Sequence, residues 1–150
     1  MRRGRIADDA EKDRSIMARQ FHNPEPYRSE NRPYAMAVKA GKLVFLAGQL
    51  GVEFIGDKRT VVAPGNGERQ IETIFNNMRS VLKGVDAGLE DICWLQIFVT
   101  NIDDRLSMDA VRRRFFGGTK LPAATMVEVS RLALPGAVVE VNAIAVIEGA

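Results

Sequence analysis

Residues 68–86 read ERQIETIFNNMRSVLKGVD, and residues 93–100 read CWLQIFVT. In the first segment the large apolar side chains recur at steps of three and four residues, at Ile71, Ile74, Met78, Leu82 and Val85. This spacing predicts an amphipathic helix over residues 68–86, with Gly88 just beyond its C-terminal end. The second segment alternates with a period of two, which predicts a strand with one wholly apolar face that carries Cys93, Leu95 and Ile97.

The segments on either side of this pair complete a mixed α+β pattern. In chain order we predict a hairpin over 35–39 and 43–47, a turned segment over 53–62, a helix from Asp103 or Asp104 to about Phe116, and strands over 125–130 and 138–147. Each helix lies between strands, so a mixed sheet with both helices on one face is the simplest arrangement. The other face of such a sheet has no cover within the chain. If that face is apolar, it predicts an oligomer with a site at a subunit seam.

Composition excludes several classes of protein. The 150 residues hold 21 Lys and Arg against 19 Asp and Glu, and a net charge of +2 does not by itself indicate a nucleic-acid partner. The single cysteine, Cys93, cannot close an intrachain disulfide, which fits a reducing compartment. The longest apolar runs have five residues, whereas a membrane helix needs roughly 20. The basic N-terminus lacks the pattern of a secretory or mitochondrial signal, so we expect a cytoplasmic location.

The N-terminal part differs from the rest of the chain. Residues 1–20 are highly charged with few large apolar groups, and Asn23-Pro24-Glu25-Pro26 follows. We therefore predict an N-terminal arm over residues 1–32 and one domain over residues 33–150.

Several motifs of that domain are similar to those of one known family. They are Pro33-Tyr34-Ala35-Met36-Ala37-Val38, residues 41–49 (GKLVFLAGQ), residues 98–101 (FVTN), Arg114-Phe115-Phe116-Gly117, Pro122-Ala123, residues 127–132 (VEVSRL) and residues 139–145 (VEVNAIA). In this order, over about residues 33–147, the chain resembles the reactive-intermediate deaminase (RidA/YjgF) family.

The resemblance implies a chorismate-mutase-like α+β fold, with two helices packed on one face of a mixed sheet, assembled as a barrel-like homotrimer with clefts between subunits. It also implies hydrolysis of small enamines and imines, such as 2-aminoacrylate and its imine tautomer, to a 2-keto acid and ammonia. No metal or organic cofactor is implied.

Four site residues follow from the resemblance. Glu140 matches the acid that positions a water near the imine carbon, a role that suits a carboxylate. Tyr34 and Gln49 would shape the cleft, and the backbone at Gly48 would approach the ligand closely. The alternatives stay open: a polar residue on the wetter face of a strand for Glu140, a buried ring for Tyr34, and a simple bend at Gly48 and Gln49.

The sequence departs from the family pattern where the substrate should be held. The arginine that clamps the substrate carboxylate is replaced by Ala124, and an asparagine of the family is replaced by Asp109. A methyl group makes no charge-assisted hydrogen bond, so another cation, Arg28 or Arg32, would be needed. Otherwise the substrate is neutral or cationic and meets Asp109.

Two hypotheses about function follow from the replacements at Ala124 and Asp109. The first is a deaminase-like hydrolase with low activity on 2-aminoacrylate. The second is a non-catalytic trimer of the same family that binds a small ligand or a protein partner.

Other polar and reactive groups have plainer interpretations. We expect Glu128 to form an ion pair that supports the assembly, and Cys93 to be a buried thiol. His22 has no companion at metal-site spacing, so no metal is expected. Arg112-Arg113-Arg114 with Lys120 is the densest basic cluster, but consecutive helix positions point in different directions, so a solvated helix face is favoured over an RNA surface.

Overall fold

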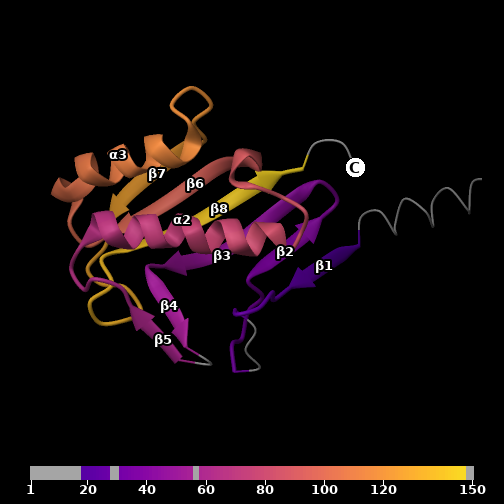
Figure 1. The fold of residues 1–150 in the computed structure, drawn as a ribbon, viewed down its shortest axis with the longest axis horizontal. Helices are drawn as coiled ribbons and strands as arrows, with labels where there is room; N and C mark the ends of the chain where they lie inside the picture. The colour runs from indigo at the N-terminus through magenta and orange to yellow at the C-terminus, as the bar shows by residue number, and fades with distance from the viewer. Residues whose placement is uncertain (1–17, 28–30, 56–57, 148–150) are drawn as a thin grey trace, which may run out of the picture.

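The computed structural model describes residues 18–27, 31–55 and 58–147. A six-stranded sheet runs in the order β1-β2-β3-β8-β6-β7, and a separate two-stranded sheet consists of β4 and β5 (Figure 1). The strands are β1 (Arg19–His22), β2 (Ala37–Ala40), β3 (Leu43–Leu50), β4 (Val52–Ile55), β5 (Lys58–Val61), β6 (Ile92–Val99), β7 (Ala123–Glu128) and β8 (Val139–Val146). All neighbours in the large sheet are antiparallel except β6 and β7. The predicted α+β class is therefore confirmed.

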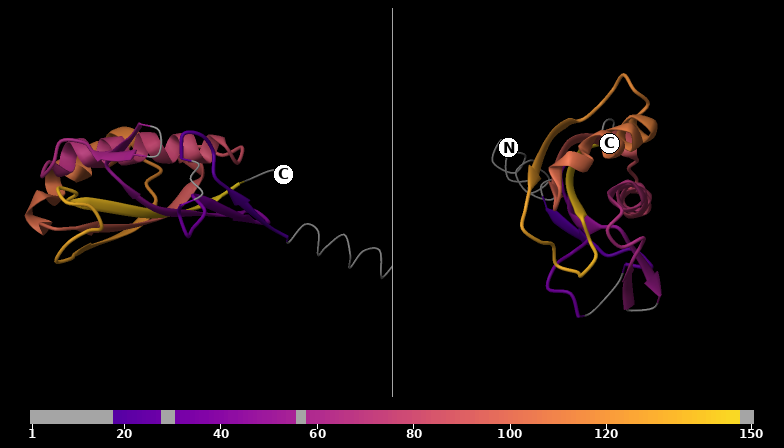
Figure 2. Two further views of the ribbon diagram at one scale, coloured as in Figure 1. Left: turned by 90° about the horizontal axis from the view of Figure 1, so that it is seen from below. Right: turned by 90° about the vertical axis from the view of Figure 1, so that its left-hand side faces the viewer.

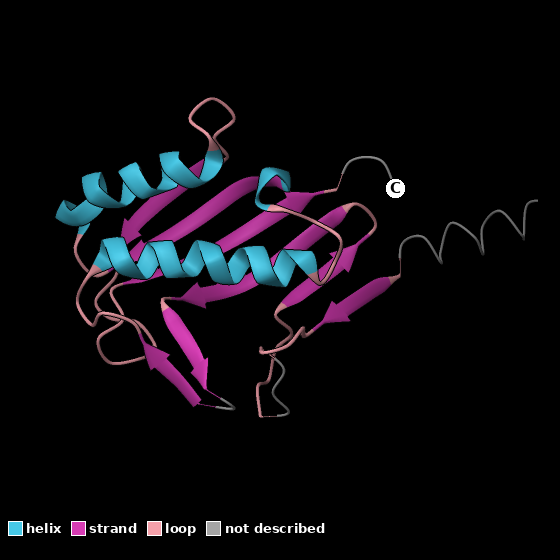
Figure 3. Ribbon diagram, viewed as in Figure 1, coloured by secondary structure: helices cyan, strands magenta, loops and turns pink. Residues whose placement is uncertain are grey.

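Two helices cover one face of the sheet. They are α2 (Gly67–Lys83) and α3 (Arg105–Phe116), and both lie on the same side (Figures 2 and 3). Asn66 begins α2 by accepting a hydrogen bond from the backbone N–H of Arg69 at 2.9 Å. The helix ends at Lys83, before Gly84. The prediction that this helix continues to Asp86 is thus wrong, and Gly88 precedes a 3-10 turn over Leu89–Asp91.

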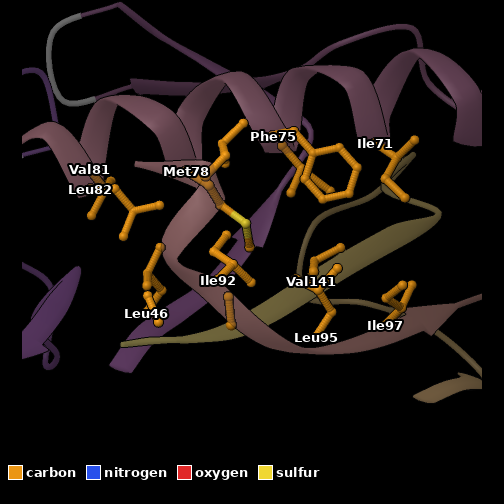
Figure 4. Close-up of a cluster of buried hydrophobic side chains, with 14 of the residues drawn as sticks. Leu46, Ile71, Phe75, Met78, Val81, Leu82, Ile92, Leu95, Ile97 and Val141 are labelled. Carbon is orange, nitrogen blue, oxygen red and sulfur yellow. The ribbon is translucent and has the colours of Figure 1, made fainter. Parts of the chain in front are cut away.

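The core fills the space between α2 and the sheet. The apolar residues of α2, among them Ile71, Phe75 and Met78, point toward Leu46, Leu95, Ile97 and Val141 of the strands (Figure 4). Phe75 also contacts α3, with its ring centroid 5.3 Å from that of Phe115 and 5.2 Å from that of Phe116. One ring thus joins both helices to the sheet.

The prediction that Cys93 is buried is wrong, because a β-bulge lies at this residue. Ile92 pairs with Ala145 of β8 and Trp94 with the adjacent Ile144, so Cys93 is the extra residue on β6. Its side chain is exposed, and its thiol lies 3.4 Å from the Ile144 carbonyl oxygen. The alternation resumes at Leu95, which is fully buried.

The open face of the sheet carries an apolar row. An unbroken series of cross-strand pairs runs across five strands. It joins Phe21 to Val38, Val38 to Phe45, Phe45 to Ile144, and Ile144 to Trp94. Residues directly opposite each other on neighbouring strands share a face. Phe21 is 65% exposed and Phe45 is 43% exposed. This is the face of the sheet that the helices leave uncovered, and the row of residues across its centre is apolar.

The segment predicted as an arm contributes to the sheet. Arg19–His22 form β1, which pairs antiparallel with β2. Residues 1–17 lie outside the described residues, so the domain boundary between residues 32 and 33 stays a prediction. Neither helix in the described part of the chain is long and apolar enough to cross a membrane.

Candidate functional site

A cavity of about 320 Å³ lies beside the bulged part of β3. Its lining comes from the segment before β2, from β3, from the β4–β5 hairpin, from the loop after β7 and from β8. Four predicted site residues line it together: Tyr34, Gly48, Gln49 and Glu140. They lie up to 106 positions apart in the sequence, and the sheet register brings them to one place.

The bulge in β3 creates the close approach at Gly48. Leu46 pairs with Ala143 and Gln49 with Val141, so Ala47 and Gly48 together oppose Asn142. A Cβ built on Gly48 would overlap the Glu140 Oε1 and would lie 3.1 Å from the Asn142 Oδ1. The glycine therefore gives the Glu140 carboxylate a place directly against the backbone of β3. The simple bend considered for this position is a bulge inside one continuous strand.

Burial changes the electrostatics of the Glu140 carboxyl. Burial raises the pKa of its carboxyl above the ordinary glutamate value. Its strand neighbours Val139 and Val141 are fully buried on the helix side, whereas Glu140 faces the cavity. A carboxyl with a raised pKa exchanges protons closer to neutral pH than an ordinary glutamate does.

Gln49 and Tyr34 line the same cavity as Glu140 but differ in exposure. Gln49 is 3% exposed, and its Nε2 donates a hydrogen bond to the Ala47 carbonyl oxygen at 3.0 Å. That bond fixes the amide beside the bulge. Tyr34 is exposed at the cavity wall, which disagrees with the buried-ring alternative.

Asp109 and Ala124 do not reach this cavity. Asp109 lies on α3, where its carboxylate pairs with Arg112 at 2.7 Å and lines a separate hollow of about 100 Å³. Ala124 is exposed on the edge strand β7, opposite Leu95 of β6. Within one chain these two residues are apart from Glu140, and their predicted roles in substrate binding stay predictions.

Two guanidinium groups do reach the cavity. Arg32, one of the two candidate cations, lines it, and so does Arg59 of β5. Arg28 lies outside the described residues. Sequence reasoning missed Arg59 because nothing in the turned segment 53–62 indicates that its hairpin folds over the end of β3.

Glu128 contacts the backbone of its own chain. Its Oε2 accepts a hydrogen bond from the backbone N–H of Ile102 at 2.9 Å, at the turn that leads into α3. The ion pair expected to support the assembly would involve a second chain and stays a prediction. Within the described ranges, no three His, Cys, Asp or Glu side chains are grouped as a metal site would require.

Comparison with known proteins identifies the family. The model of the family described as "Endoribonuclease L-PSP" matches residues 23–147. The chain belongs to the RidA/YjgF family. This RidA-family protein is 34% identical to a 2-iminobutanoate/2-iminopropanoate deaminase of Dermatophagoides farinae, over 77% of this chain and 87% of that one. It is 31% identical to a RutC family protein of Pyrococcus horikoshii, over 75% and 86% of the two chains.

Solved structures of RidA-family proteins share the fold. A Rid-family protein from Yersinia pestis has a TM-score of 0.75 and 27% identity, covering 87% of this chain and 100% of the other. RidA from a Psychrobacter species has a TM-score of 0.74 and 24% identity, covering 85% and 99%. The fold implied by the sequence motifs is thereby confirmed for this RidA-family protein, apart from its assembly.

The position of Gly48 in this RidA-family protein can be tested directly. In Gly48→Ala the new methyl group displaces the Glu140 carboxylate outward toward solvent, so the pKa of Glu140 is expected to fall toward the ordinary value. The displaced group is the end of a flexible side chain, so the thermal midpoint should change little. NMR titration of the Glu140 carboxyl carbon measures the pKa. An unchanged pKa in a folded variant would contradict the contact.

Proposed function

We propose that the protein hydrolyses small imines and enamines of the 2-imino and 2-amino acid type, releasing a 2-keto acid and ammonia. The observation that carries the proposal is the half-buried Glu140 carboxylate against Gly48, facing a cavity. Support also comes from the relative in Dermatophagoides farinae, whose name describes a deaminase for 2-iminobutanoate and 2-iminopropanoate.

Glu140 would act first as a base and then as an acid. The carboxylate accepts a proton from a water molecule while the water oxygen bonds to the carbon of the protonated imine, which gives a neutral carbinolamine. The protonated Glu140 then donates that proton to the carbinolamine nitrogen, the C–N bond breaks, and ammonia leaves with the electron pair. The Glu140 carboxylate accepts the hydroxyl proton as the carbonyl forms and later releases it to solvent. Overall, one protonated imine and one water give one keto acid, one ammonia and one proton, with no change of oxidation state.

The cavity of one chain would be completed by a second copy. The apolar row on the open face, from Phe21 to Trp94, is the surface that a partner would cover. We therefore propose the homotrimer implied by the family motifs, with Asp109 or Ala124 of one chain near the cavity of another. Light scattering on the purified protein should give three times the mass of one chain. A monomeric mass would contradict this part of the proposal.

A coupled assay tests the activity. An amino acid oxidase with catalase generates 2-iminopropanoate or 2-iminobutanoate in the cuvette, and keto-acid formation is followed with and without this protein. We expect a rate above the uncatalysed one that is proportional to the concentration of the protein. No acceleration with either imine would contradict the proposal.

The second candidate is a ligand-binding protein without turnover. The exposed methyl group of Ala124, where active members of the family carry arginine, favours it. A ligand that binds the folded state raises the melting temperature by mass action. A rise with 2-keto acids in the absence of hydrolysis would identify a binder. Turnover in the coupled assay would identify an enzyme.

A further inference from the structure

Arg32 and Arg59 line one cavity together with Phe54. The Arg32 guanidinium carbon lies 5.1 Å from the centroid of the Phe54 ring. Phe54 and Arg59 are direct cross-strand partners in the β4–β5 hairpin, so their side chains leave the same face of that hairpin. Arg32, Phe54 and Arg59 all line the same cavity, although the two arginines lie 27 positions apart in the sequence.

Arg32 is held in place by its neighbours. One of its terminal nitrogens donates a hydrogen bond to the Tyr27 carbonyl oxygen and lies 3.2 Å from the Met36 sulfur. Tyr27 in turn packs edge-on against Phe54, with the ring centroids 4.7 Å apart. The guanidinium is thus oriented before any ligand arrives, which lowers the entropic cost of binding.

No carboxylate in the described part of the chain pairs with either arginine. Glu53 precedes Phe54, but it pairs with Thr60 and therefore points to the other face of the hairpin. Among the described residues, the charged groups that line the cavity are Arg32, Arg59 and Glu140. Two cations that line one cavity, neither of them in an ion pair with a described carboxylate, can attract an anion, and a guanidinium matches the planar geometry of a carboxylate.

We propose that Arg32 and Arg59 form a carboxylate-binding subsite that orients a small 2-keto or 2-imino acid in the cavity with its C2 carbon toward Glu140. The proposal rests on the proposed function for which end of the ligand reacts. It assigns the contact with the ligand carboxylate to Arg32 and Arg59 and not to position 124, where this chain has alanine in place of the family arginine. A cavity of about 320 Å³ is large enough for an acid of three or four carbons.

Glu140 agrees with this orientation. In the described part of the chain, neither arginine forms an ion pair with the Glu140 carboxylate. Burial raises the pKa of that carboxyl. A ligand in the cavity can present its anionic end to the arginines and its reacting carbon to the acid.

Pyruvate binding tests the subsite without requiring turnover. We expect isothermal titration to show that Arg59→Gln weakens binding roughly 10- to 100-fold, as for loss of a hydrogen bond to a charged group. Arg59 is exposed and makes no ion pair with a described residue, so the variant should fold. Lys58→Gln is the matched control, because Lys58 is the adjacent cation and points to the other face. Its effect should be below about twofold.

Two further measurements sharpen the test. Arg59→Lys keeps the charge but loses the two-pronged geometry, so its affinity should fall between those of wild type and Arg59→Gln. Pyruvamide, which has the same shape without the charge, should bind no better to wild type than to Arg59→Gln. Equal pyruvate affinity in Arg59→Gln and Lys58→Gln would overturn the subsite, as would the absence of pyruvate binding by wild type.

The outcomes separate this proposal from the proposed function. Pyruvate binding that depends on Arg59, without imine hydrolysis, would leave the subsite standing and refute the enzyme. Imine hydrolysis with a KM unaffected by Arg59→Gln would leave the enzyme standing and refute the subsite. If both hold, Arg59→Gln should raise KM for 2-iminobutanoate more than it lowers kcat.

Discussion

Glu140→Gln is expected to lower imine hydrolysis by roughly 100- to 10,000-fold, the usual range for loss of a general acid–base group. Glutamine has nearly the same shape, but its amide cannot accept a proton from water. The coupled assay measures the rate. In the wild type the rate should fall on acidification at a higher pH than an ordinary glutamate would give, because burial raises the pKa of Glu140.

Glu140→Gln is expected to lower the rate of hydrolysis without lowering the stability of the fold. A raised pKa in the folded state means that the fold disfavours the ionised carboxyl, so the contribution of Glu140 is best at low pH and is lost as the pH rises through the folded pKa. Glu140→Gln should therefore be at least as stable as wild type at pH 8. That relative gain should shrink toward pH 4.

A hydrolysis rate of Glu140→Gln within tenfold of the wild-type rate, in a folded variant, would refute the catalytic role of Glu140.

Phe75→Ala is expected to lower the free energy of unfolding by about 3–5 kcal/mol, the usual cost of truncating a buried phenylalanine. Phe75 is fully buried and contacts Phe115 and Phe116 of α3 as well as the core beneath α2 (Figure 4). The truncation leaves a cavity where both helices meet the sheet. Urea unfolding at a fixed protein concentration measures the loss.

Leu106→Ala provides the control for Phe75→Ala. Leu106 is an apolar residue of α3 that is 71% exposed, so its truncation should change the free energy of unfolding by less than about 0.5 kcal/mol. A loss below about 1 kcal/mol for Phe75→Ala would show that Phe75 does not join the layers.

The candidate site was predictable where a family motif marked it. The motifs around Tyr34, Gly48 and Glu140 identified residues that the structure gathers at one cavity. The same reasoning gave no prediction for Arg59, because a cation in a short exposed strand has no distinguishing local pattern. Its place depends on where the β4–β5 hairpin packs.

The sequence alone determined the element types, since the periods of 3.6 and 2 are properties of the local chain. It also indicated the family, and the family motifs predicted an acid–base role for Glu140. The tertiary structure decided what depends on strand pairing: the exposure of Cys93, the close approach of Glu140 to the backbone at Gly48, and the addition of β1 to the sheet. A bulge shifts the alternation by one residue, and hydrogen bonds to a distant strand set its position. Arg32 and Arg59 likewise line one cavity only once the hairpin has folded against the segment before β2.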